Sequence, residues 1–237
     1  MNSYRKTAMI VGVLFIIATV APLLSFPFSG FITDDPDYLV NVSANATQVI
    51  IGALFEFIMC LAIAGIAIWA YPILKKHNDG LALGYVGFRL IEGILLTIAV
   101  IGLLSLLTLS QEFVKAGAPD ASYFQSLGTL LLAARDWTGV LGSFAFILGA
   151  LMYYYIFYQS KLIPRWLSVW GLIGVPLWIA AELLIMFGLI ESFSTNAILL
   201  DIPIAVNEMV LAVWLIVKGF NPSAIASLSA KTDINEV

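Results

Sequence analysis

Long apolar segments alternate with short polar connectors along nearly the whole chain. A helix needs about 20 apolar residues, each rising about 1.5 Å, to cross roughly 30 Å of hydrocarbon. Six segments reach that length, and they run from Ala8 to Phe26, Val49 to Tyr71, Leu81 to Leu109, Trp137 to Tyr158, Leu167 to Ile190 and Ile202 to Phe220. The pattern therefore predicts an all-α fold, a polytopic bundle of six transmembrane helices.

The connectors support narrower predictions. Residues Ala121 to Ala134 are moderately apolar and contain no helix breaker except Gly128, so they either extend the fourth helix outward or lie along the membrane interface. Asn45 or Thr47 is expected to cap a helix. Asp201 is expected to cap or flank the sixth helix from outside.

Glycines recur at intervals that favour close packing of membrane helices. The glycines concerned are Gly84, Gly87, Gly93, Gly139, Gly142, Gly149, Gly171 and Gly174. We expect them to let neighbouring helices approach closely, which predicts a tight bundle.

The composition supports a membrane protein. Of the 237 residues, 61% are apolar and 11% charged, whereas a soluble domain carries roughly 25% charged residues. We expect residues 1–220 to form one transmembrane domain and residues 221–237 a mobile cytoplasmic tail. Lipid is the expected partner and nucleic acid is not, although the net charge of −4 is a weak guide when charges are segregated across a membrane.

The basic residues predict the orientation, because cytoplasmic loops carry an excess of Lys and Arg. On one side fall Arg5, Lys6, Lys75, Lys76, Lys161, Arg165, Lys218 and Lys231, and on the other only Lys115. The opposite loops carry Asp34, Asp35, Asp37, Glu112, Asp120 and Glu191. This asymmetry predicts a multi-pass protein of the cytoplasmic membrane with both termini in the cytoplasm.

Seven ionisable side chains fall within or at the edge of the predicted spans. They are Glu56, Arg89, Glu92, Arg135, Asp136, Glu182 and Glu208. Each costs at least about 2.5 kcal/mol at the bilayer centre, so such side chains face the bundle interior and mark function by default. The three glutamates at 56, 182 and 208 each lie roughly eight residues, or about 12 Å, below the outer boundary.

The balance of these charges leads to a functional hypothesis. Five acids face two bases, and a low-dielectric interior does not hold the resulting excess of negative charge without compensation. We therefore expect a polar cavity that opens outward and holds a proton, a cation or a small polar ligand. The alternative is a salt-bridge network, with Arg89 and Arg135 shared among the acids, that only fixes the bundle.

Other chemistries lack their residues. The single histidine, His77, lies in a short inner loop, so histidine-based zinc catalysis and bis-histidine haem are not expected. The sequence predicts no specific metal site or cofactor, although a carboxylate-only site for a divalent cation stays open. The single cysteine, Cys60, is expected to be a buried packing residue.

Four patches resemble the prokaryotic multi-span membrane proteins grouped as domain of unknown function 4386. The patches are Arg89-Leu-Ile-Glu92, Ala133-Ala-Arg-Asp136, Leu162-Ile-Pro-Arg-Trp-Leu-Ser-Val-Trp-Gly-Leu-Ile-Gly174 and Trp214-Leu-Ile-Val-Lys-Gly-Phe220. The resemblance implies a bacterial or archaeal cytoplasmic membrane protein and implies no activity.

Three functional hypotheses follow. The first is binding or transport of a proton, cation or small polar solute, with Glu56, Glu182 and Glu208 as acceptors and Arg89 and Arg135 as counter-charges or anion clamps. Six short-looped helices are few for a transporter, so a homodimer is expected. The second is an intramembrane enzyme that uses a glutamate as acid or base on a lipid or small molecule. The third is a sensor or accessory subunit.

Overall fold

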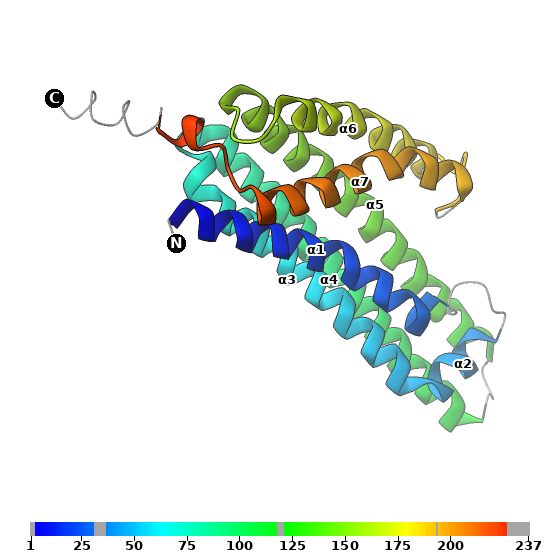
Figure 1. Ribbon diagram of the computed structural model, residues 1–237. Helices are drawn as coiled ribbons and strands as arrows, with labels where there is room; N and C mark the ends of the chain where they lie inside the picture. Colours follow the sequence, from blue (N-terminus) through cyan, green and yellow to red (C-terminus); the bar gives the residue numbers. More distant parts are fainter. Residues whose placement is uncertain (1–2, 31–36, 118–120, 193, 227–237) are drawn as a thin grey trace. The chain divides into compact units, whose positions relative to one another are not determined.

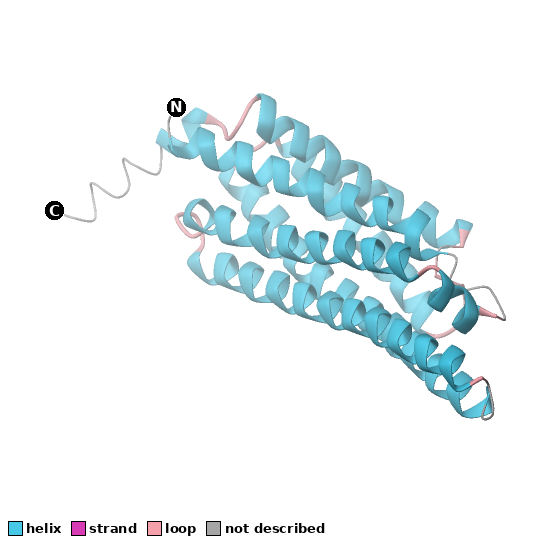
Figure 2. Ribbon diagram, turned by 90° about the horizontal axis from the view of Figure 1, so that it is seen from below, coloured by secondary structure: helices cyan, strands magenta, loops and turns pink. Residues whose placement is uncertain are grey.

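The computed structural model describes residues 3–30, 37–117, 121–192 and 194–226. These residues form helices joined by short loops and contain no strand (Figure 2). Six of the helices are long and apolar enough to cross a membrane. The predictions of an all-α fold and of six candidate spans are therefore confirmed, and the chain is a multi-span membrane protein.

Seven helices are labelled along the chain in Figure 1. They are α1 (Ser3–Ser29), α2 (Tyr38–Ala44), α3 (Ala46–Leu74), α4 (Asp79–Ala116), α5 (Ala121–Ser160), α6 (Arg165–Met186) and α7 (Thr195–Val217). A further short helix covers residues 222–226.

The fourth predicted span is longer than its apolar core. Helix α5 runs without a break from Ala121 to Ser160, so the segment before Trp137 extends this helix. Gly128 does not interrupt it. A side chain at Gly128 would overlap the ring of Tyr38, whose hydroxyl donates to the carbonyl oxygen of Gln125 at 3.3 Å. The glycine therefore makes room for α2 against α5.

The boundary between α6 and α7 differs from the prediction. Helix α6 ends at Met186, and Gly188 two residues later has a φ of +68°, a conformation that stops a helix and suits glycine. Helix α7 begins at Thr195, where the hydroxyl oxygen of Ser194 accepts from the backbone N–H of Ala197 at 3.3 Å. Asp201 therefore lies inside α7, and its expected place outside that helix was wrong.

The first connector contains helix α2, which was not predicted because it is only seven residues long. Asn45 is the C-cap of this helix, and its side-chain amide donates to the carbonyl oxygen of Asn41 at 2.9 Å. The expected capping role of Asn45 is thus confirmed. Four charged residues used in the orientation argument lie outside the described residues, namely Asp34, Asp35, Asp120 and Lys231.

The chain divides into two compact units, which we describe separately. Unit 1 contains Met1–Ile16, Ala62–Glu92 and Ser143–Val237, and unit 2 contains Ile17–Leu61 and Gly93–Gly142. In unit 2, buried apolar side chains from α2, α3 and α4 form a core that includes Leu39, Val49 and Leu103. Cys60 belongs to this core, as predicted.

Unit 1 is held together by close contacts of α7 with α1 and α6. A Cβ at Gly12 of α1 would lie 2.7 Å from the carbonyl oxygen of Ala212 in α7, and one at Gly174 of α6 would lie 3.0 Å from Cβ of Ile204. Glycine at these points lets the helix backbones approach closely. The prediction of close packing is therefore confirmed at Gly174. It is also confirmed at Gly171, where a side chain would overlap the Tyr154 ring. At Gly87 and Gly139 no other atom lies within 4 Å of an added Cβ.

Arg5 joins α1 to the end of α7 within unit 1. Its guanidinium group donates to three carbonyl oxygens at the end of α7, those of Leu215 at 3.1 Å, Ile216 at 2.6 Å and Val217 at 3.1 Å. The last carbonyls of a helix have no partner within it, and a basic side chain that binds them also complements the negative end of the helix dipole.

Candidate functional site

The seven ionisable candidates divide between the two units. Arg89, Glu92, Glu182 and Glu208 belong to unit 1, and Glu56, Arg135 and Asp136 belong to unit 2. Arg89, Glu92, Glu182 and Glu56 are buried, Arg135 and Glu208 are partly buried, and Asp136 is exposed.

Arg89 and Glu92 form an ion pair inside unit 1. A guanidinium nitrogen of Arg89 lies 2.9 Å from a carboxylate oxygen of Glu92, and the two side chains are only 4% and 8% exposed. Their spacing of three residues places them on one face of α4, so the helix itself brings them together. The guanidinium also lies 5.4 Å from the ring centroid of Phe146, and its aliphatic stem packs against Gly149 of α5.

Helix α5 brings two adjacent tyrosines to the polar residues of α7. The hydroxyl of Tyr153 donates to a carboxylate oxygen of Glu208 at 3.0 Å, and the hydroxyl of Tyr154 donates to the side-chain oxygen of Asn207. Asn207 in turn donates to the carbonyl oxygen of Leu167 in α6 at 3.0 Å. Glu208 also interacts electrostatically with Arg89. Residues from α4, α5, α6 and α7 thus form one polar network, which we call the Arg89 network.

Glu182 occupies a different place in unit 1. Its carboxylate accepts from the indole N–H of Trp178, one turn earlier on α6, at 3.0 Å. It also accepts a hydrogen bond from Ser143 of α5 and interacts electrostatically with Asp201 of α7. These hydrogen bonds hold Glu182 in a polar environment within the apolar helix packing.

In unit 2, Glu56 pairs with Arg135. Their closest oxygen and nitrogen lie 2.7 Å apart, and the side chains are 12% and 25% exposed. Glu56 accepts a second hydrogen bond from Ser25 of α1 at 3.1 Å, and Arg135 donates to the carbonyl oxygen of Ala99 at 2.9 Å. This pair joins α3 to α5, with α1 and α4 contributing one contact each. Asp136 follows Arg135 but is exposed.

The Arg89 network contains functional candidates that the sequence analysis missed. Tyr85, Tyr153 and Tyr154 are fully buried, and the ring centroids of Tyr85 and Tyr153 lie 5.2 Å apart. Three consecutive tyrosines at 153–155 inside a predicted span were a visible signal. A search for charged side chains does not find these tyrosines, although a hydroxyl in an apolar core needs a partner as well.

The charges of the Arg89 network do not balance. One guanidinium, that of Arg89, faces two carboxylates, those of Glu92 and Glu208, and the tyrosine and asparagine partners carry no formal charge. A buried excess of negative charge is unfavourable unless a proton or a cation neutralises it. Among the described residues, no group of three or more His, Cys, Asp or Glu side chains is arranged to hold a metal ion.

Comparison with known proteins identifies one family. A family model described as "Domain of unknown function (DUF4386)" matches residues 10–219. No curated protein and no solved structure matches the chain. The matched range contains every residue of the two buried ion pairs, together with Glu208 and its tyrosine partner.

Proposed function

The chain belongs to the DUF4386 family of multi-span membrane proteins, and we propose that it binds and transfers a proton or a small cation through the carboxylates of the Arg89 network. The observation that carries this proposal is the buried guanidinium of Arg89, which pairs with Glu92 at 2.9 Å and also interacts electrostatically with the partly buried Glu208. Ionisable side chains inside membrane spans typically mark pathways for protons, ions or polar solutes.

Glu208 is the best candidate for the exchangeable group. Glu92 has its arginine one helical turn away at 2.9 Å, whereas Glu208 accepts a hydrogen bond from the neutral hydroxyl of Tyr153. A carboxyl group that receives a hydrogen bond from a hydroxyl can stay ionised beside a cation or take up a proton. We therefore assign uptake and release to Glu208, and to Arg89 the role of fixed counter-charge.

The distribution of basic residues supports the orientation we propose, with both termini in the cytoplasm. Arg5 contacts the end of α7, Lys76 donates to the hydroxyl of Tyr4 at 2.8 Å, and the backbone N–H of Asn221 donates to Leu162 beside Lys161. The basic residues of these segments thus gather at one end of unit 1. Lys115 lies in the last turn of α4, within unit 2. We also propose the cytoplasmic membrane as the location of the protein, as the family resemblance implies.

Proton or cation transfer is tested in liposomes that contain the purified protein. After a pH gradient is imposed, a trapped pH-sensitive dye should report faster dissipation with the wild type than with Glu208→Gln, by about tenfold or more, since glutamine neither ionises nor takes up a proton. Repeating the assay with opposing K⁺ or Na⁺ gradients shows whether a metal cation moves instead.

Glu191→Gln is the matched control, because Glu191 is an exposed acid of the same unit. It should leave the rate unchanged. Equal rates for the wild type, both variants and empty liposomes would rule out the proposal, provided that all proteins keep their helical circular dichroism. Equal but fast rates for the three proteins would place transfer at another group.

A further inference from the structure

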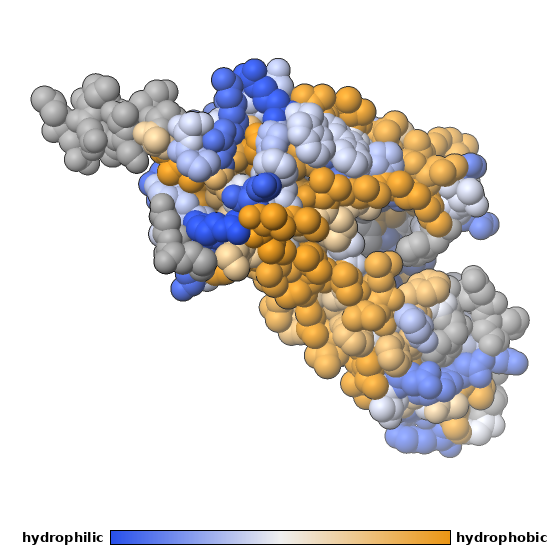
Figure 3. Space-filling view, in the orientation of Figure 1, coloured by the Kyte–Doolittle hydropathy of each residue, from blue (hydrophilic) through white to orange (hydrophobic). Residues whose placement is uncertain are grey.

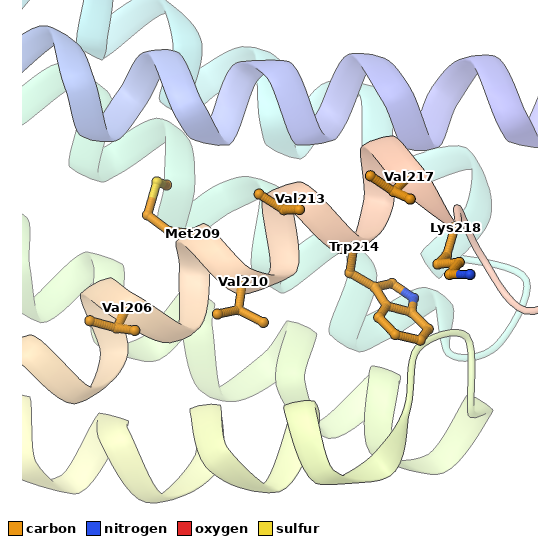
Figure 4. A pocket seen from close by; sticks show the side chains of 7 residues that line it. All are labelled: Val206, Met209, Val210, Val213, Trp214, Val217 and Lys218. Carbon is orange, nitrogen blue, oxygen red and sulfur yellow. The ribbon is translucent and has the colours of Figure 1, made fainter.

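Helix α7 carries a shallow apolar hollow on one face. The hollow has a volume of about 410 Å³, and it is lined by Val206, Met209, Val210, Val213, Trp214, Val217 and Lys218 (Figure 4). Spacings of three and four residues place these side chains along one side of the helix. In Figure 4 the hollow lies along α7 where α1 passes on one side and α6 on the other.

A second hollow continues from the end of the first. It has a volume of about 290 Å³ and shares Trp214 and Lys218 with it. Its other lining residues come from the loop between α5 and α6 and from the residues just after α7, among them Pro164 and Asn221. The lining therefore changes from apolar side chains between Val206 and Val217 to a mixture of polar and apolar residues at the C-terminal end of the helix.

The length of the apolar hollow matches one leaflet of a bilayer. From Val206 to Lys218 the helix rises about 18 Å at about 1.5 Å per residue, and half of a hydrocarbon core is about 15 Å thick. Lys218, the C-cap of α7, then lies at the polar boundary, while Val206 lies near the bilayer centre. An acyl chain from the leaflet on the Lys218 side fits this length.

The charge at this end favours a negatively charged headgroup. Hydrophilic side chains gather where α1 begins and α7 ends, beside the hydrophobic surface of both helices (Figure 3). The guanidinium of Arg5 is occupied by carbonyl oxygens of α7, and the ammonium group of Lys76 by Tyr4. Lys218 is exposed and, within the described part of the chain, forms no ion pair.

We propose that the two joined hollows bind an anionic glycerophospholipid. One acyl chain lies against the valines of α7, and the phosphate lies at Lys218. Trp214 lies between the acyl-chain part and the headgroup part of the site. Its indole N–H faces the headgroup region and its ring contacts the acyl chain. The site belongs to the leaflet that faces the basic end of unit 1.

The test is native mass spectrometry of delipidated full-length protein titrated with phosphatidylglycerol or phosphatidylcholine of identical acyl chains. The wild type should hold one phosphatidylglycerol about fivefold more tightly than phosphatidylcholine, the expected effect of one lysine near a lipid surface. Lys218→Gln should remove this preference. Lys75→Gln is the matched control, because Lys75 lies at the same end of the unit and lines neither hollow, and it should keep the preference.

A second pair of variants tests the acyl-chain part. Val210→Trp fills the hollow and should weaken both lipids, whereas Leu199→Trp, on an exposed position of the same helix outside the hollow, should weaken neither. Equal affinity for both lipids in the wild type overturns the proposal. An equal preference for phosphatidylglycerol in Lys218→Gln and Lys75→Gln also overturns it. A protein dimer that Val210→Trp abolishes overturns it as well, since a second copy of the chain would then occupy the hollow.

Discussion

The two ion pairs that the described residues form inside the helix packing differ in how far apart their members lie in the sequence. Arg89 and Glu92 are three residues apart, so a single face of α4 brings them together. Glu56 and Arg135 are 79 residues apart, so their pairing depends on how α3 and α5 are rotated about their axes. Hydropathy does not specify that rotation, which is why the sequence could identify these residues without pairing them.

The Glu56–Arg135 pair should contribute measurably to stability. Glu56→Gln leaves the partly buried guanidinium of Arg135 without its counter-charge, and we expect a loss of about 2 kcal/mol in the free energy of unfolding. Thermal unfolding in detergent, followed by circular dichroism, measures the loss.

Glu112→Gln provides the comparison, because Glu112 pairs with Lys115 at 2.8 Å on the surface, where both side chains are more than half exposed. An exposed pair of this kind contributes less than about 1 kcal/mol. If the two variants unfold at the same temperature, the Glu56–Arg135 pair does not stabilise the protein.

At the scale of the helix, apolar length predicted where helices exist and local chemistry decided where they end. Helix α7 begins seven residues before the predicted Ile202, because Ser194 caps it and because neither Asp201 nor Pro203 breaks it. Helix α6 ends at Met186, although the apolar run continues to Ile190. Hydropathy does not separate a helical residue from an apolar residue in a turn, so the ends could not be predicted from it.

Close packing between α5 and α6 predicts a glycine-specific effect. In Gly171→Ala the added methyl group would overlap the ring of Tyr154, which is buried and hydrogen bonded to Asn207. We expect a loss of about 1–3 kcal/mol from overpacking, measured by thermal unfolding.

Gly87→Ala is the same substitution on α4, at a place where nothing lies within 4 Å of the new atom. Alanine favours a helix over glycine by up to about 1 kcal/mol, so this variant should be as stable as the wild type or more stable. Equal destabilisation by both substitutions would mean that the contact with Tyr154 does not set the spacing of the helices.

At the scale of the whole molecule, composition predicted the membrane and the length of the apolar segments predicted the number of candidate spans, since lipid demands long apolar helices. The division into two units could not be predicted, because both draw on distant parts of the chain and several helices contribute to each. The single cavity expected from the seven ionisable residues was inferred from the depth of these residues along their helices, and it stays a prediction. Depth along a helix can be counted from the sequence, whereas the neighbours of each side chain cannot.

The proposed orientation makes a prediction about the two ends of α4. In a Cys60→Ala background, a membrane-impermeant maleimide should label Ala116→Cys in intact cells and Gly80→Cys only in inverted vesicles, because both positions are exposed and α4 has 38 residues. That length corresponds to about 57 Å, more than a bilayer core requires. The opposite labelling pattern would reverse the orientation, and labelling of both positions in intact cells would mean that α4 does not cross.

The contact between Arg5 and the end of α7 has a consequence for biosynthesis. Arg5 leaves the ribosome 210 residues before the first of the carbonyl oxygens that it binds, which belong to Leu215, Ile216 and Val217. Every residue of unit 2 lies between Arg5 and these partners and precedes residue 143. Unit 2 can therefore assemble while translation continues, and unit 1 is completed only when α7 returns to α1.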